Sequence, residues 1–330
     1  MNMDLLSIVI PTYNNSKFLD YLLELQLPII EKYKIKLYIC DNKCTDNTSE
    51  VITKWSKKYP FIDCRINDIH LSVQKNIEQA INLPSSKYVW LLGDRYYIPD
   101  GTIKYVLDSL NTEPSKDLLI VNLENLINNT PSFNYDNSEV LLSDLGHLMT
   151  CIAVSIINIK AIKKLKFKDY YDSAFPHFCT LFEYLNSNNF NALWVSEFSV
   201  KAISHPNLNR KNWSHDERAL SLGAKDWVTS VFSLSSDYSY DSKIKCIKKF
   251  GVLSKLFTFR GIVLMRMRGN LTYSTYKKYS REISLVVNYS EVIVVLMSVF
   301  PRSILKFLYA LLSIMPKKIT QKIGFVNGNE

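Results

Sequence analysis

The sequence predicts an α/β fold, in which a mainly parallel sheet is flanked by helices and a helical region follows at the C-terminus. Two observations carry this prediction. Short apolar runs alternate with helical patterns along the first half of the chain, and polar residues follow each apolar run. With 330 residues, 47% of them hydrophobic, the chain is also large enough to bury a full core.

Three apolar runs are predicted to be strands: residues 5–10, 36–42 and 87–94. The spacing of apolar side chains predicts helices over residues 17–33, 45–59 and 72–83. Pro28 is expected to interrupt the first of these helices, because proline has no backbone N–H. Strands and helices that alternate in this way favour a parallel sheet, and such sheets bind ligands beyond the carboxyl ends of their strands.

Polar residues gather at these predicted strand ends, in residues 11–15, 41–48 and 93–102. A buried parallel strand needs no acid at its end for stability. Asp41 and Asp94 nevertheless end two of the three predicted strands, which indicates a functional site rather than a solvated strand end.

Four segments resemble the nucleotide-binding half of the family 2 glycosyltransferases: SIVIPTYNN, CDNKCTDNT, VQKNIEQAI and YVWLLGD, in that order and spacing. That family has the GT-A fold, a Rossmann-type sheet flanked by helices. The resemblance covers roughly residues 5–110 and fades beyond them. It implies transfer of a sugar from a nucleoside diphosphate donor, expected to be a UDP-sugar, to the hydroxyl of a saccharide or lipid-linked saccharide. The expected product is a bacterial capsule, O-antigen or cell-wall polysaccharide.

The resemblance also implies a set of donor-binding residues. Position by position, they are Pro11, Thr12, Tyr13, Asn14, Asp41, Lys75, Asn76, Asp94 and Arg95. The first residues of this set would line the base and ribose pocket, and Asp41 would accept a hydrogen bond from the base. Asp94 would be the first acid of a metal-binding D-x-D motif.

A divalent metal ion is the expected cofactor, because carboxylate oxygens suit Mg²⁺ or Mn²⁺ and the leaving diphosphate gains negative charge. The resemblance implies Asp94 and His205 as ligands. The second acid of the motif is replaced by Tyr96, so metal dependence stays open. Arg95 lies between the two positions, where its guanidinium can hold phosphate oxygens directly.

The rest of the site is expected in residues 173–206, where a predicted helix, a strand and a histidine follow one another as in the family. The alignment puts His177 at the position of the catalytic base, and Asp172 is the rival base five residues upstream. His177 and His205 have a plainer interpretation, as a helix-start residue and a loop residue. A single displacement by the acceptor hydroxyl would invert the sugar configuration.

The last quarter of the chain is strongly basic, because residues 243–330 hold 16 Lys and Arg against three acids. Its apolar runs, residues 283–300 and 303–315, are marginal or short for a membrane span. The basic residues that flank them are Lys277, Lys278, Arg281, Arg302, Lys306, Lys317 and Lys318. This combination favours helices at an anionic membrane surface, with a packed subdomain or a homo-oligomer contact as the alternative. No nucleic-acid motif is present, so nucleic acid is not an expected partner.

These patterns predict a catalytic domain over residues 1–235 and a basic helical region over residues 236–330. Within the catalytic domain, the nucleotide-binding half covers about residues 1–110 and the acceptor half about residues 111–235. Six cysteines without a C-x-x-C pair, and an N-terminus without the positive segment of a signal peptide, predict a cytoplasmic protein on the inner face of the membrane.

Two further classes of function remain open at this point. The missing second acid is compatible with a catalytically weak relative that serves as a binding or scaffolding subunit. A nucleotidyltransferase is disfavoured, because a chain with only 9 glycines shows no glycine-rich phosphate loop near its start.

Overall fold

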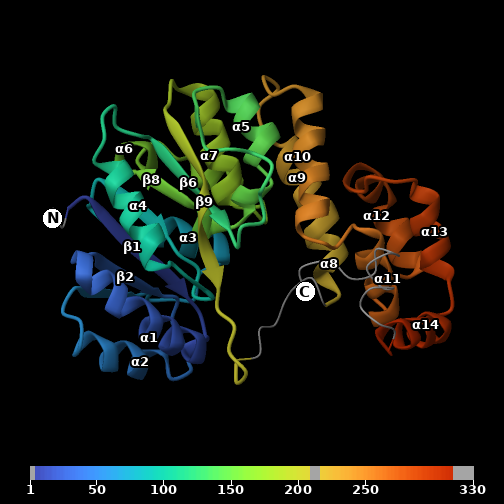
Figure 1. The fold of residues 1–330 in the computed structure, drawn as a ribbon, viewed down its shortest axis with the longest axis horizontal. Helices are drawn as coiled ribbons and strands as arrows, with labels where there is room; N and C mark the ends of the chain where they lie inside the picture. The colour runs from blue at the N-terminus through green and yellow to red at the C-terminus, as the bar shows by residue number, and fades with distance from the viewer. Residues whose placement is uncertain (1–3, 209–215, 315–330) are drawn as a thin grey trace. The chain divides into compact units, whose positions relative to one another are not determined.

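The computed structural model describes residues 4–208 and 216–314 of the chain. Contacts divide the protein into two compact units (Figure 1), one formed by Met1–Arg210 and Ser233–Lys243 and the other by Lys211–Phe232 and Ile244–Glu330. The chain therefore passes between the units near residues 210, 232 and 243, whereas the sequence suggested one boundary at residue 235.

The first unit is built on a nine-stranded sheet in the described part of the chain, with the order β3-β2-β1-β4-β8-β6-β9-β5 and with β7 paired to β9. The strands are β1 (Leu6–Thr12), β2 (Lys36–Asp41), β3 (Ile62–Ile66), β4 (Tyr88–Leu91), β5 (Tyr96–Tyr97), β6 (Leu118–Leu123), β7 (Phe133–Tyr135), β8 (Ser155–Asn158) and β9 (Ala192–Ala202). Strands β1 to β4 pair in parallel, and β8 runs antiparallel to both β4 and β6. The predicted mixed sheet with a parallel N-terminal half is confirmed.

Helices connect and cover these strands. In the first unit they are α1 (Ser16–Tyr33), α2 (Thr48–Ser56), α3 (Val73–Ile81), α4 (Asp100–Leu110), α5 (Ser138–Leu145), α6 (Ile159–Ile162) and α7 (Pro176–Ser187). Helix α1 packs beside α2, whereas α3 packs on β1, β2 and β4 and beside α7. Ile8, Val9 and Ile10 of β1 are completely buried, which explains why this central parallel strand is a continuous apolar run.

Two local expectations from the sequence are wrong. Pro28 does not interrupt α1, which is continuous from Ser16 to Tyr33. Pro28 has no N–H to donate to the carbonyl of Glu24, four residues earlier. Both residues are exposed, so water can donate to that carbonyl instead. The sequence also gave no strand at residues 62–66, because β3 is an edge strand whose side chains are all at least partly exposed.

The second unit is helical. Its helices are α8 (Arg218–Leu220), α9 (Trp227–Phe232), α10 (Tyr240–Leu253, shared with the first unit), α11 (Phe259–Arg268), α12 (Tyr273–Val286), α13 (Glu291–Val299) and α14 (Arg302–Ile314). Of the helices in the described ranges, none is by itself long and apolar enough to cross a membrane. Glu291–Val299 and Arg302–Leu311 meet that criterion only as a pair, which is bent by 103°. Lys317 and Lys318 lie outside the described residues.

All six cysteines are free. None of them is arranged with other residues of the described ranges as a metal site.

Gly261 offers a direct test of the packing in the second unit. An added Cβ would lie 2.1 Å from the carbonyl oxygen of Lys255 and 2.3 Å from that of Leu256. We expect Gly261→Ala to destabilise the protein by about 1–3 kcal/mol, because the backbone cannot move aside freely. The matched control is Gly101→Ala in the first turn of α4, where the nearest atom to the new Cβ is Phe198 Cε1 at 3.8 Å. Thermal unfolding should give a lower midpoint for Gly261→Ala alone, and equal midpoints would contradict the packing described.

Candidate functional site

The carboxyl ends of the parallel strands place the predicted polar residues along one edge of the sheet. In the β1–β2 pair Thr12 lies opposite Asp41, and in the β1–β4 pair Val9 lies opposite Leu91. Asp94 follows the end of β4 by three residues. The structure therefore brings Thr12, Asp41 and Asp94 to the same edge, as the sequence predicted.

Asp94 is held by residues of the loop that follows β1. Thr12 Oγ1 donates a hydrogen bond to Asp94 Oδ2 at 3.0 Å, and the Asn15 side chain also hydrogen-bonds to this carboxylate. Burial raises the pKa of Asp94 above its usual value, whereas the hydrogen bonds from Asn15 and Thr12 and the charge of Arg95 act in the opposite direction. Asp94 is thus a partly buried carboxylate in a fixed orientation, unlike a solvated strand end.

Asp41 is buried at the end of β2, and one of its oxygens has a local partner. Its Oδ1 accepts the backbone N–H of Cys44 at 2.7 Å, which closes the turn after the strand. A carboxylate has further acceptor capacity on its second oxygen. Asp41 can therefore hold the turn and still accept a hydrogen bond from a ligand.

Asn76 does not face a ligand, contrary to the role that the resemblance implied. Its side chain is buried, and its Oδ1 accepts hydrogen bonds from Asn67 Nδ2 at 3.1 Å and from the Cys40 thiol at 3.4 Å. Asn67 Nδ2 also donates to Asn42 Oδ1 at 3.0 Å, and that oxygen accepts the Leu71 N–H at 2.9 Å. This amide network fixes the loop between β3 and α3.

Tyr13 and Asn14 lie on the exposed side of the β1–α1 loop. The Tyr13 ring packs against the ring of His70, with centroids 4.2 Å apart and planes tilted by 34°. His70 belongs to the loop that the amide network holds, and nothing in the sequence pattern singled it out. Asn14 has φ 46°, and its Oδ1 accepts the Thr45 N–H at 2.7 Å. The two loops together present an aromatic surface and a polar rim at the same edge.

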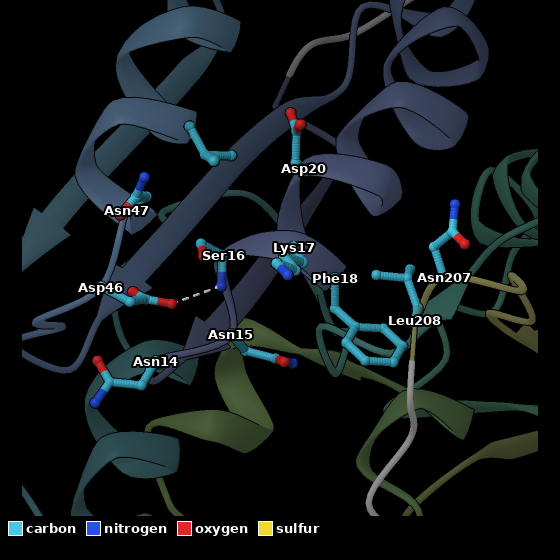
Figure 2. A pocket seen from close by; sticks show the side chains of 11 residues that line it. Asn14, Asn15, Ser16, Lys17, Phe18, Asp20, Asp46, Asn47, Asn207 and Leu208 are labelled. Atoms are coloured by element: carbon cyan, nitrogen blue, oxygen red, sulfur yellow. Dashed lines mark hydrogen bonds between the residues drawn. The ribbon is translucent and has the colours of Figure 1, made fainter.

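A cavity of about 700 Å³ lies at the loop that follows β1 (Figure 2). It is lined by the start of α1, the start of α2 and residues 207 and 208. Asn15, which bonds to Asp94, and Phe18, whose ring lies 5.3 Å from the Arg95 guanidinium carbon, both line it. The volume falls in the usual range for small-molecule sites.

Asp46 joins the two helices that border this cavity. Figure 2 shows its carboxylate directed at Ser16, whose backbone N–H donates to Oδ2 at 2.9 Å. Its Oδ1 accepts the Thr48 N–H at 3.2 Å. One acid thus satisfies orphan N–H groups at the starts of both α1 and α2, and the cavity wall is held in place.

The structure does not group the predicted metal ligands with further acids. In the described ranges no three His, Cys, Asp or Glu side chains are close enough together to hold a metal ion. His205 Nδ1 accepts the Asn207 N–H at 3.2 Å, and its ring lies 4.7 Å from the Tyr21 ring. Tyr96 belongs to β5 and pairs with Ala202. Of the predicted ligands, Asp94 alone supplies a carboxylate to a divalent cation.

The predicted role of His177 as general base is inconsistent with its surroundings. Its Nε2 lies 3.1 Å from the Thr150 carbonyl, and its Nδ1 is buried without a hydrogen-bond partner among the described residues. The ring lines a small apolar cavity with Leu91, Met149 and Leu181. Burial lowers the pKa of His177 to about 4, although hydrogen bonds to the backbone oppose this shift. His177 is therefore a helix-start residue, as in the plainer interpretation, and its ring packs in the interior.

Asp172 has a different environment. It is exposed, and it lies in the loop before α7 that contacts the start of α3. Gln74 Nε2 donates to the Ser173 carbonyl at 3.1 Å, and the Lys75 ammonium lies 5.4 Å from the Tyr171 ring centroid. Lys75 is exposed as well. The carboxylate of Asp172 and the ammonium of Lys75 therefore both face solvent near the amino end of α3.

Comparison with known proteins identifies the family. The model of "Glycosyl transferase family 2" matches residues 7–172, half of the chain. The chain belongs to glycosyl transferase family 2. It is a glycosyltransferase, and its mainly parallel sheet is the fold of that family.

Individual relatives of this glycosyltransferase are similar only in part. A segment of 92 residues is 36% identical to abequosyltransferase RfbV of Salmonella typhimurium and covers 27% of each of the two chains. The structure of S. aureus TarS 1–349 in complex with UDP-GlcNAc matches over 93% of this chain and 92% of that chain, with TM-score 0.53 and 15% identity. Mannosyltransferase PcManGT from Pyrobaculum calidifontis in complex with GDP-Man and Mn²⁺ matches over 96% and 82%, with TM-score 0.51 and 11% identity. At these identities the likeness shows the shared GT-A fold.

The Thr12–Asp94 hydrogen bond predicts a shift in the pH dependence of the glycosyltransferase. The bond favours the charged carboxylate, so Thr12→Val should raise the pKa of Asp94 further. The acidic limb of the pH–rate profile should then move to higher pH, because less Asp94 is ionised at a given pH. Thr53→Val, which removes an exposed hydroxyl on α2, is the control. An acidic limb that stays in place in Thr12→Val would show that ionisation of Asp94 does not govern the rate.

Proposed function

We propose that this glycosyltransferase moves a sugar from a UDP-sugar to an acceptor hydroxyl during synthesis of a bacterial surface polysaccharide such as capsule, O-antigen or cell-wall polymer. The observation that carries the proposal is the carboxylate of Asp94, which is held by Thr12 and by Asn15, a residue that also lines a cavity of about 700 Å³. Two similarities support the donor and the product class. TarS binds UDP-GlcNAc in its complex, and RfbV is an abequosyltransferase.

The edge of the sheet offers distinct groups to the two ends of the donor. The base would stack on the exposed Tyr13 ring, and Asp41 would accept its N–H through the acceptor capacity that remains beside its bonds to Cys44. Lys75 and Arg95 supply positive charge for the diphosphate. Pro11 and Thr12 end β1, and we propose that they line the base and ribose pocket.

A divalent cation fits Asp94 only in part. Asp94 would hold Mn²⁺ or Mg²⁺, which when bound would offset negative charge on the leaving diphosphate. Because Asp94 is the one carboxylate among the predicted ligands, and no three candidate ligands of the described residues lie together, we propose that the Arg95 guanidinium carries a substantial share of that stabilisation. His205, whose Nδ1 accepts the Asn207 N–H, stays a proposed second ligand through its imidazole.

We propose Asp172 as the general base, because its carboxylate is exposed whereas the His177 ring lines an apolar cavity. In the proposed step its carboxylate takes the proton of the acceptor hydroxyl, and the acceptor oxygen forms a bond to the anomeric carbon. The bond from that carbon to the diphosphate oxygen breaks, and the nucleoside diphosphate leaves with the electron pair. One such displacement inverts the configuration of the sugar. The acceptor would be a saccharide or a lipid-linked saccharide.

Hydrolysis of UDP-sugars by the purified full chain tests the function most simply. We expect slow release of UDP from at least one UDP-sugar in the absence of acceptor, measured with and without Mn²⁺. The Asp94→Asn variant is the control and should release none. Binding of UDP without any release would instead support a binding or scaffolding subunit.

The two rival bases predict different mutant behaviour. Asp172→Asn should lower kcat by about 100-fold or more, as loss of a general base usually does. His177→Gln should keep kcat near that of the parent enzyme and lower the thermal midpoint, because the ring is buried in the core. Steady-state kinetics and thermal unfolding of both variants check this. The reverse pattern would restore His177 as the base.

The partial metal site predicts unusual tolerance of chelation. Activity should persist in part after EDTA treatment, because Arg95 supports the diphosphate without a metal. Arg95→Ala should lower the rate at least about 10-fold, about 1.4 kcal/mol in barrier, and more than His205→Ala. Complete loss of activity with EDTA, full rescue by Mn²⁺ and an unaffected Arg95→Ala would contradict this assignment.

A further inference from the structure

Helix α13 directs part of its apolar surface outward. Val292, Leu296 and Val299 are 57–61% exposed, and their spacing of four and three residues puts them on one side of the helix. The opposite side is anchored, because Val294 and Ser298 are buried and α13 packs on α11 and α12. The exposed side chains are thus a feature of a packed helix.

Helix α14 continues this surface. Ile304, Phe307, Leu308 and Leu311 are 45–64% exposed and follow the spacing i, i+3, i+4, i+7 of a single helical face. Leu305 is buried, and α14 contacts α11. The apolar stripe that normally faces a core therefore faces outward here. We call these residues, Val292, Leu296, Val299, Ile304, Phe307, Leu308 and Leu311, the α13–α14 apolar face.

Exposed basic side chains occur on α14 itself and on α12, which contacts α13, and acids are absent from the face. No Asp or Glu occurs between residues 292 and 314. Glu291, at the start of α13, accepts a hydrogen bond from the Tyr276 hydroxyl. Arg302 and Lys306 of α14 are exposed, as are Lys277 and Lys278 of the neighbouring α12. An apolar strip with a cationic border has the chemistry of an interfacial membrane anchor.

The dimensions favour a position in the interface and exclude a simple span. Helices of this length measure roughly 14 Å for α13 and 20 Å for α14 at 1.5 Å per residue, short of the ~30 Å of a bilayer core. The two are bent by 103°. Neither helix can cross by itself.

We propose that the α13–α14 apolar face inserts into the surface of an anionic lipid bilayer, with Arg302, Lys306, Lys277 and Lys278 against the lipid phosphates. A second copy of the chain is the less suitable occupant, because it would bring the same positive charge to the contact. The proposal does not depend on the donor chemistry. It would hold the enzyme on the inner face of the membrane, where lipid-linked acceptors are presented.

Vesicle sedimentation with the full chain tests this inference. The protein should pellet with phosphatidylglycerol-containing vesicles at low salt, less at high salt, and weakly with pure phosphatidylcholine vesicles. The double variant Phe307→Ser with Leu308→Ser should bind at least about 10-fold more weakly, because two exposed apolar side chains no longer enter lipid. The double variant Lys278→Glu with Lys306→Glu should lose affinity for anionic vesicles. Its binding to pure phosphatidylcholine vesicles should not change. Val140→Ser, at an exposed valine of α5, is the matched control.

Thermal unfolding and sedimentation velocity complete the test. All the substituted side chains are exposed, so the midpoints of the variants should match that of the parent chain. Full-length protein that ignores anionic vesicles at low salt would overturn the proposal. The proposal would also be wrong if the parent chain formed a dimer that the Phe307→Ser, Leu308→Ser variant could not form while its vesicle binding was unchanged. The apolar face would then bind a second copy of the chain.

Discussion

The parallel pairing of β1 with β2 and β4 is the constraint on which the candidate site depends. Because these three strands share one direction, their carboxyl ends meet at one edge of the sheet. The register then places Thr12 opposite Asp41, and the loop beyond β4 returns Asp94 to the hydroxyl of Thr12. A slip of one residue would exchange the two buried faces of β1 and disrupt the packing on both of them, so the core that fixes the register also places Thr12 opposite Asp41.

Buried polar groups hold the loops that extend from this edge. The amides of Asn42, Asn67 and Asn76 bond to one another, and Asp46 joins the starts of α1 and α2. Such groups are costly inside a protein unless their hydrogen bonds are made. Some residues of the family segments therefore act on loop geometry, and Asn76 is one of them. The network holds the loop between β3 and α3, and His70 of that loop packs against the exposed Tyr13 ring.

The apolar runs were sufficient to predict β1, β2 and β4, since strands buried by helices on both faces are continuous in sequence. Four ordered segments were sufficient to predict the family, which the match over residues 7–172 confirmed. The sequence could not predict the direction in which a single side chain points. A histidine in the first turn of α7 can direct its ring to solvent or to the core, and His177 directs it to an apolar cavity. The edge strand β3 lacks an apolar run, and the outward direction of the stripe on α14 depends on which face of that helix packs on α11.

The central claim is that the edge holding Asp41 and Asp94 binds the nucleoside diphosphate of the donor. A crystal structure of the full chain with UDP tests it most directly. The account predicts the uracil against Tyr13 and Asp41, and the diphosphate within hydrogen-bond distance of Arg95 or of a cation held by Asp94. UDP bound elsewhere, with Asp94 and Arg95 in contact with protein atoms alone, would contradict it.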